Sequence, residues 1–98
     1  MQRTKIVCTI GPVSASSAKL TAMMKAGMRV ARLNLSHGTH AEHRALMKTI
    51  RSVAKTLKLQ VPIIADIQGP KIRLGLLPQE GVVLKNNQRV RFSTAIDT

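Results

Sequence analysis

The residues 30–39, which read VARLNLSHGT, join an apolar run to a cluster of polar side chains. Alternation along an extended strand puts Arg32, Asn34 and Ser36 on one side of it and His37 on the other. The planar guanidinium of an arginine can clamp a phosphoryl group, and amide and hydroxyl oxygens are hard ligands for a cation. This pattern predicts a site for a phosphorylated ligand, assisted by a cation.

A second polar stretch, DIQGPKIR at residues 66–73, follows the next apolar run. Asp66 is predicted to lie one strand away from Arg32 and could add the negative charge that a cation site needs. An alternative stays open, because buried polar networks of this kind are common. In it, Arg32 and Asp66 form a structural ion pair, while Asn34 and Ser36 cap loop amides.

Three histidines, His37, His40 and His43, recur at intervals of three residues, which raises the question of a metal site. His40 and His43 could share a helix face, but His37 precedes the expected helix cap, and no cysteine or suitably spaced carboxylate completes a ligand set. We therefore expect loop and helix-surface roles for them, and we expect His37 to be the one that meets a ligand.

Three short apolar runs, at residues 5–10, 28–35 and 61–65, are rich in β-branched residues and are typical of buried strands. Two amphipathic helices are predicted between them. The runs therefore indicate an α/β fold, a parallel βαβαβ unit with right-handed crossovers. Ligands of such folds lie beyond the carboxyl ends of the strands, where all the polar motifs above converge.

The first helix is predicted to begin at Ser14 or Ser16 and to end at Gly27. Its apolar face contains Leu20, Met23 and Met24. The second begins with a capping box formed by Thr39 and Glu42. Its apolar stripe comprises Leu46, Met47, Ile50, Val53, Ala54 and Leu57, and its opposite face carries Arg44, Lys48, Arg51 and Lys55. Four cations on the outer face of a helix are typical of a solvated surface.

The pattern changes after Gly75. Residues 82–85 and 89–92 flank Asn86-Asn87, residues that tolerate a left-handed turn, so we expect a β-hairpin there. We place a domain boundary between residues 74 and 80.

Composition narrows the class of function. The 98 residues contain 16 Lys and Arg against four acids, a formal charge of +12, which favours anionic partners. Phe92 is the single aromatic residue, so the stacking platform of many nucleic-acid modules is missing, and we do not expect nucleic acid as a partner. One cysteine, Cys8, excludes an internal disulfide, and we expect a small buried side chain there. The chain shows neither a membrane span nor a secretory signal, so we expect a soluble, cytoplasmic protein.

Three ordered motifs resemble the pyruvate kinase family: TKIVCTIGP at residues 4–12, GMRVARLNLSHGTHAEH at 27–43, and ADIQGPKIRLG at 65–75. The resemblance implies that residues 1–75 form the first three strands of a TIM (β/α)8 barrel and that residues 76–98 start a β lid domain. It also implies the glycolytic transfer of a phosphoryl group between phosphoenolpyruvate and ADP, giving pyruvate and ATP, with Mg²⁺ and often K⁺.

The resemblance also implies roles for individual residues. Arg32 would be catalytic and contact the phosphoryl group of the substrate. The monovalent-cation site would comprise Asn34, Ser36, Asp66 and the carbonyl of Ile67. The nucleotide would lie along Asn34, Ser36, His37 and Arg73, with His37 and Arg73 at its phosphates.

One departure from the family concerns the third motif. Many K⁺-dependent members have threonine, lysine and glutamate where this chain has Ile67, Gln68 and Lys71. The ammonium of Lys71 could substitute for the cation, so we hypothesise a K⁺-independent enzyme. The family's catalytic lysine and acidic Mg²⁺ ligands lie on later strands, so we expect this chain alone to be inactive.

The sequence is compatible with three hypotheses about the protein. The first is an N-terminal part of a pyruvate kinase, either an isolated piece or a truncated gene product. The second is a standalone basic module that binds nucleic acid or an acidic protein. The third is an interaction module whose open sheet pairs with itself or with a complementary fragment. Because an open three-stranded sheet has unpaired edges, we expect a homo-oligomer or a self-associating chain in every case.

Overall fold

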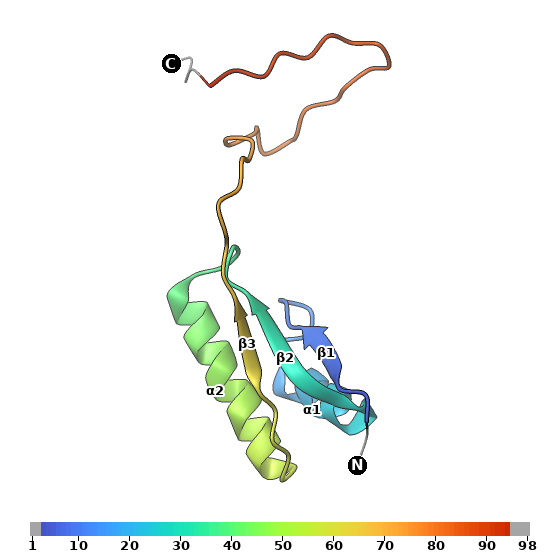
Figure 1. Cartoon of the computed structure of the whole chain (residues 1–98), viewed down its shortest axis with the longest axis vertical. Coiled ribbons are helices and arrows are strands. Elements are labelled where there is room, and N and C mark those ends of the chain that lie inside the picture. The colour runs from blue at the N-terminus through green and yellow to red at the C-terminus, as the bar shows by residue number, and fades with distance from the viewer. Residues whose placement is uncertain (1–2, 95–98) are drawn as a thin grey trace.

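The computed structural model describes residues 3–94. Its centre is a parallel sheet with the strand order β1-β2-β3, formed by β1 (Ile6–Thr9), β2 (Met28–Asn34) and β3 (Ile63–Asp66) (Figure 1). The three predicted strands are confirmed, with ends that differ from the apolar runs by one or two residues. The polar motifs follow the carboxyl ends of these strands, as expected.

The first crossover is helix α1 (Ser17–Ala26). Of the two candidate caps, Ser16 is the one used, since its hydroxyl accepts a hydrogen bond from the Lys19 amide at 3.2 Å. The helix ends at Gly27, whose φ of 125° lies in a region that side chains rarely adopt. Both predicted signals for the helix ends are therefore confirmed.

The second crossover is helix α2 (His40–Thr56). The capping box is present in both directions: the Thr39 hydroxyl accepts from the Glu42 amide at 3.2 Å, and the Glu42 carboxylate accepts from the Thr39 amide at 2.7 Å. This box starts the helix immediately after the polar turn that follows β2. It therefore fixes where that turn ends.

Both helices pack on one face of the sheet. The buried side chains of this core are Ile10, Leu20, Met24, Met28, Ala31, Leu33, Ile50, Val53 and Ala54. Cys8 is half-buried against this core, close to the expectation of a small buried side chain. Sequential parallel strands with their helices on a single face are the arrangement found at the start of a (β/α) barrel, whereas a doubly wound sheet is covered on both faces.

The opposite face of the sheet is open. Val7, which pairs with Val30, is 50% exposed, and Ile64, which pairs with Arg32, is 44% exposed. In a closed barrel this face would be the interior. Within the described residues it carries apolar side chains near its middle and polar side chains at the carboxyl edge.

Beyond β3 the chain leaves the sheet and continues to residue 94 without helix or strand (Figure 1). The expected turn is present, because Asn87 has a φ of 62° and the Gln88 amide donates to the Lys85 carbonyl at 3.1 Å. The hairpin prediction was wrong in its strands, since residues 82–85 and 89–92 do not pair and their side chains are exposed. A two-stranded ribbon is marginal without a surface to pack on, and the structure offers none here. Within residues 3–94, neither helix is long and apolar enough to span a bilayer.

Candidate functional site

The carboxyl edge of the sheet gathers side chains from all three strands. Thr9 of β1 lies in register with Arg32 of β2, and Asn34 of β2 lies in register with Asp66 of β3. Residues paired in register share a face, and Arg32 and Asn34 are two positions apart, so all four point to the open face. The predicted convergence of Arg32, Asn34 and Asp66 is therefore present.

Arg32 occupies the centre of this edge. One nitrogen of its guanidinium donates to the Thr9 hydroxyl at 2.7 Å, and another pairs with the Asp66 carboxylate. The side chains of Arg32 and Asp66 remain 38% and 41% exposed. A guanidinium has five N–H donors, so Arg32 is oriented by two neighbours and still open toward a ligand. The structural ion pair weighed from the sequence is the arrangement seen here.

Asn34 organises the turn after β2. Its side-chain oxygen accepts from the Ser36 amide at 3.0 Å, and its carbonyl accepts from the His37 amide at 3.4 Å. The Leu35 amide donates to the Asp66 carbonyl at 3.0 Å, which ties the turn to β3. The structural alternative predicted that the side chains of Asn34 and Ser36 both cap loop amides. Asn34 does so, whereas Ser36 supplies the amide that Asn34 caps.

A cavity of about 630 Å³ opens beside this edge. It lies between the loops that follow β1 and β2 and the first turns of α2. Its walls comprise Thr9, Ile10, Gly11, Pro12, Ala15, Asn34, His37, Gly38, Glu42, His43 and Leu46. His37 thus reaches the same space as Asn34, and His43 lines it too, so the role of His37 as the ligand-facing histidine stays a prediction. Pro12 and His43 were not predicted as site residues, although the Gly11-Pro12 turn at the end of a strand is a signal that could have suggested the first.

The first turn of α2 carries a charge at the rim of the cavity. The Thr39 amide donates a hydrogen bond to the Glu42 carboxylate and lowers the pKa of Glu42 below its ordinary value of 4.5. The Thr39 hydroxyl and the charge of His43 act in the same direction. Glu42 is therefore an anion at neutral pH, which steadies the helix start.

The histidines of this region differ in their contacts. The ring nitrogen Nε2 of His43 lies 2.6 Å from the His37 carbonyl, so this ring is bound to the backbone of the turn. His40 is exposed at the start of α2. In the part of the chain that the structure describes, no three His, Cys, Asp or Glu side chains are grouped so as to hold a metal.

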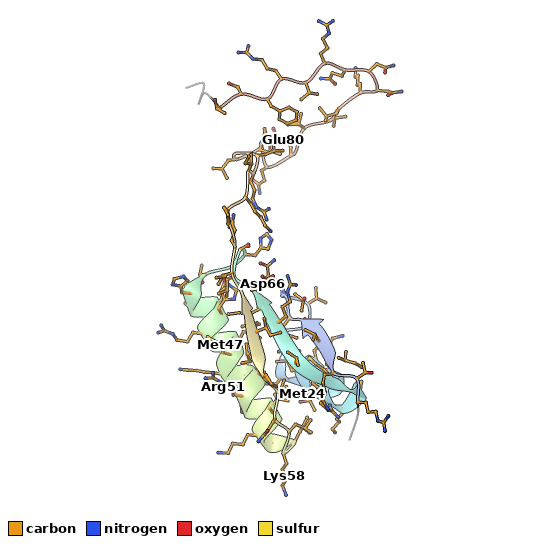
Figure 2. All side chains as sticks on the ribbon, viewed as in Figure 1. Met24, Met47, Arg51, Lys58, Asp66 and Glu80 are labelled. Atoms are coloured by element: carbon orange, nitrogen blue, oxygen red, sulfur yellow. The ribbon has the colours of Figure 1, made fainter. Side chains whose placement is uncertain are left out.

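Three of the predicted residues lie outside this arrangement. Ile67, Lys71 and Arg73 belong to the exposed stretch beyond β3. Asp66 marks the end of the sheet from which this stretch departs (Figure 2). Because nothing packs on that stretch, the structure does not bring the Lys71 or Arg73 side chains to Arg32, and their roles stay predictions.

A singly wound parallel sheet with polar groups at its carboxyl edge defines the class of α/β barrel proteins, whose sites lie at that edge. The comparisons make the assignment specific. The family model for the pyruvate kinase barrel domain matches residues 1–98. The chain belongs to the pyruvate kinase family.

Relatives in the same family are close in sequence. The chain is 49% identical over 93 residues to the pyruvate kinase of Staphylococcus epidermidis, a match that covers 95% of this chain and 16% of the relative. It is 45% identical over 92 residues to the pyruvate kinase of Corynebacterium glutamicum, covering 94% of this chain and 19% of the relative. The chain thus spans less than a fifth of the length of these curated relatives.

A solved structure agrees. A crystal structure of pyruvate kinase from Cryptosporidium parvum superposes with a TM-score of 0.72 at 42% identity, covering 81% of this chain and 16% of that one. The predicted resemblance and the barrel-type α/β fold are both confirmed by these matches.

Proposed function

We propose that this chain forms the first part of a pyruvate kinase barrel mouth that transfers a phosphoryl group between phosphoenolpyruvate and ADP, giving pyruvate and ATP in glycolysis. The observation that carries the proposal is the placement of Arg32, held at the carboxyl edge between Thr9 and Asp66. Family membership supports it, since the relatives are pyruvate kinases.

Arg32 is the catalytic residue that this chain contributes. Phosphoryl transfer depends on positioning and on neutralising charge on the equatorial oxygens. The guanidinium offers a planar fork for two of those oxygens, and its contacts with Thr9 and Asp66 set its direction before substrate arrives. Preorganisation of this kind lowers the cost of charge development in the transition state.

The cavity beside Arg32 is the proposed place of the nucleotide. Its walls include Asn34, the last residue of β2, His37 from the turn after β2, and Pro12 from the loop after β1. Ser36 and Arg73 complete the proposed nucleotide set. Arg73 would reach the phosphates once residues 67–75 pack against the rest of a barrel.

The donor set for a cation consists of Asn34, Ser36, Asp66 and the Ile67 carbonyl. These amide, hydroxyl, carboxylate and carbonyl oxygens fit a hard cation in kind. A monovalent cation bound there would supply positive charge beside the transferring phosphoryl group. Arg32 already pairs with the single carboxylate of the set, and Lys71 follows five residues later. The positive charges of the Arg32 and Lys71 side chains both support independence of the enzyme from K⁺. The acidic ligands of Mg²⁺ are expected on later strands.

The test is a chimera in which this chain replaces the aligned N-terminal part of the Staphylococcus epidermidis enzyme, to which it is 49% identical. The chimera is expected to form pyruvate from phosphoenolpyruvate and ADP, and the isolated chain is expected to form none. A chimera that folds and assembles without producing pyruvate would refute the proposal. We also propose a cytoplasmic location and a homo-oligomeric parent protein.

A second candidate function, binding of nucleic acid or an acidic protein, rests on one observation. Arg44, Lys48, Arg51 and Lys55 are exposed on α2, and Arg51 and Lys58 extend away from the sheet (Figure 2). Binding to duplex DNA measured against salt concentration tests it. Removing one of these cations should reduce the logarithmic salt slope by about one if the row contacts phosphates. An unchanged slope would leave these cations as a solvated surface.

A further inference from the structure

The turn between β2 and α2 is fixed through its amides at both ends. On the strand side, Asn34 binds the amides of Ser36 and His37. On the helix side, the Glu42 carboxylate binds the Thr39 amide. These contacts leave the middle of the turn, the peptide that joins His37 to Gly38, to be held by something else.

His43 holds that peptide. Its Nε2 atom lies 2.6 Å from the His37 carbonyl oxygen. A carbonyl only accepts hydrogen bonds, so Nε2 carries the hydrogen in this contact. The His43 amide donates to the Thr39 carbonyl at 3.0 Å, so the ring is placed by a helix that the capping box has already started.

Space around this contact is tight. Gly38 has a φ of 78°, and a Cβ built on it would lie 3.1 Å from the Glu42 carboxylate and 3.4 Å from His43 Nε2. The turn therefore runs close against the first turn of α2, and a side chain at residue 38 would be strained by the positive φ and would push Glu42 and His43 by a few tenths of an ångström. Because a peptide unit is planar, holding the His37 carbonyl also fixes the adjoining Gly38 amide and the backbone from which the His37 side chain leaves.

We propose that His43 is a positioning residue that sets His37 at the cavity through the His37 carbonyl. The inference rests on the proposed function, in which His37 meets the nucleotide phosphates in that cavity. The ring of His43 lines the same cavity, while its Nε2 is engaged by the backbone. Without this hydrogen bond the turn would keep the contacts at its two ends, but the peptide between His37 and Gly38 would lose its fixed orientation.

The test compares His43→Ala and His43→Gln with a control, His40→Ala. His40 lies one turn earlier on α2, is exposed and does not line the cavity. Alanine is the best helix former, so α2 is expected to persist in both alanine variants. Glutamine keeps a side-chain N–H that can donate to a carbonyl.

Two measurements decide the question. In ¹⁵N-labelled samples of this chain that carry Ile64→Lys on the open face to limit self-association, His43→Ala should shift or broaden the amide signals of Gly38 and Thr39, while the later α2 signals stay in place. In the chimera, the KM for ADP should rise about three- to tenfold, as expected for one lost hydrogen bond, with kcat nearly unchanged. His43→Gln should restore both readouts, and His40→Ala should change neither.

The proposal is overturned if the Gly38 and Thr39 signals of His43→Ala match the parent chain, or if His43→Gln behaves like His43→Ala. If the parent chimera forms no pyruvate, the proposed function fails. The amide signals of the isolated chain then decide the role of His43 alone, a shift supporting it and no shift refuting it.

Discussion

The guanidinium of Arg32 on β2 pairs with the carboxylate of Asp66 on β3. Asp66 lies two residues further along β3 than Ile64, which is the residue in register with Arg32. The pair thus leans toward the carboxyl edge of the sheet. The contact with Thr9 comes from the other side. Three strands therefore fix one arginine at the place where an α/β barrel binds its substrate.

Replacing this arginine should abolish most of the activity. Arg32→Ala in the chimera is expected to lower kcat/KM for phosphoenolpyruvate by about 100- to 1000-fold, the usual effect of losing one preorganised donor to a developing charge. Arg32→Lys should be intermediate, because it keeps the charge and loses the planar fork. Steady-state rates of pyruvate formation measure both variants.

The matched control for this prediction is Arg29→Ala. Arg29 lies at the opposite end of β2, where its guanidinium donates to the Met24 and Met28 carbonyls at 3.0 and 2.8 Å. Its loss should alter stability and leave the kinetics of a folded enzyme unchanged. Equal activity of the Arg32→Ala and Arg29→Ala chimeras would contradict the role assigned to Arg32.

The start of α2 should be sensitive to acid. The pKa of Glu42 is lowered in the folded chain, so its stabilising contribution is complete above 4.5, the ordinary value, and disappears as pH falls through the lowered pKa. Thermal unfolding followed by circular dichroism from pH 7 to pH 3 should therefore bring the parent chain and Glu42→Gln together at the acid end.

Thr39→Ala tests the other half of the box. It should cost about 0.5–2 kcal/mol of stability at neutral pH.

For the pH experiment with Glu42→Gln, a constant difference in stability from the parent chain across the whole pH range would show that the carboxylate charge does not act through the cap.

Much of this fold could be predicted from sequence because its signals are local. Two of these signals act within one helical turn: the capping box of Thr39 and Glu42, and the glycine after α1. The apolar stripe of α2 predicts which face of that helix is buried. The convergence of Arg32 and Asp66 was predictable as well, because parallel strands bring their carboxyl ends to one edge.

The contacts that could not be predicted from the sequence depend on the register between strands and on whether a segment has a surface to pack on. The contact of Arg32 with Thr9 follows from the pairing of β1 with β2, which includes a register shift between Ile6 and Val7 that no local signal predicts. The contact of His43 with the His37 carbonyl crosses a turn whose path is set by Gly38. The predicted strands around Asn86-Asn87 are unpaired, because strands need a surface to pack on and local residues can specify only the turn.

The chimera should work without K⁺. Its rate of pyruvate formation in K⁺-free buffer is expected to change little when K⁺ is added, because the ammonium of Lys71 is proposed to replace the cation. Lys71→Glu should create a dependence on K⁺, since it introduces a carboxylate whose charge then needs compensation. A strong rise in the rate of the parent chimera on adding K⁺ would refute K⁺ independence.

The isolated chain should associate with itself. Its open face exposes Val7 and Ile64 beside unpaired strand edges. Sedimentation velocity at tens of micromolar should show species larger than a monomer, and Ile64→Lys should reduce them. Val13→Lys is the matched control, because Val13 is 87% exposed in the loop after β1 and lies outside the sheet. A compact monomer of the parent chain would exclude self-association through this face.

We propose that these residues act as one part of a complete phosphoryl-transfer barrel. The most direct test is the intact mass of this gene's product, isolated from its source cells. We predict a mass several times the 10.7 kDa of this chain, as in relatives of which it covers 16–19%. A mass near 10.7 kDa would contradict the claim, because the strands that complete the site would then be missing from the working protein.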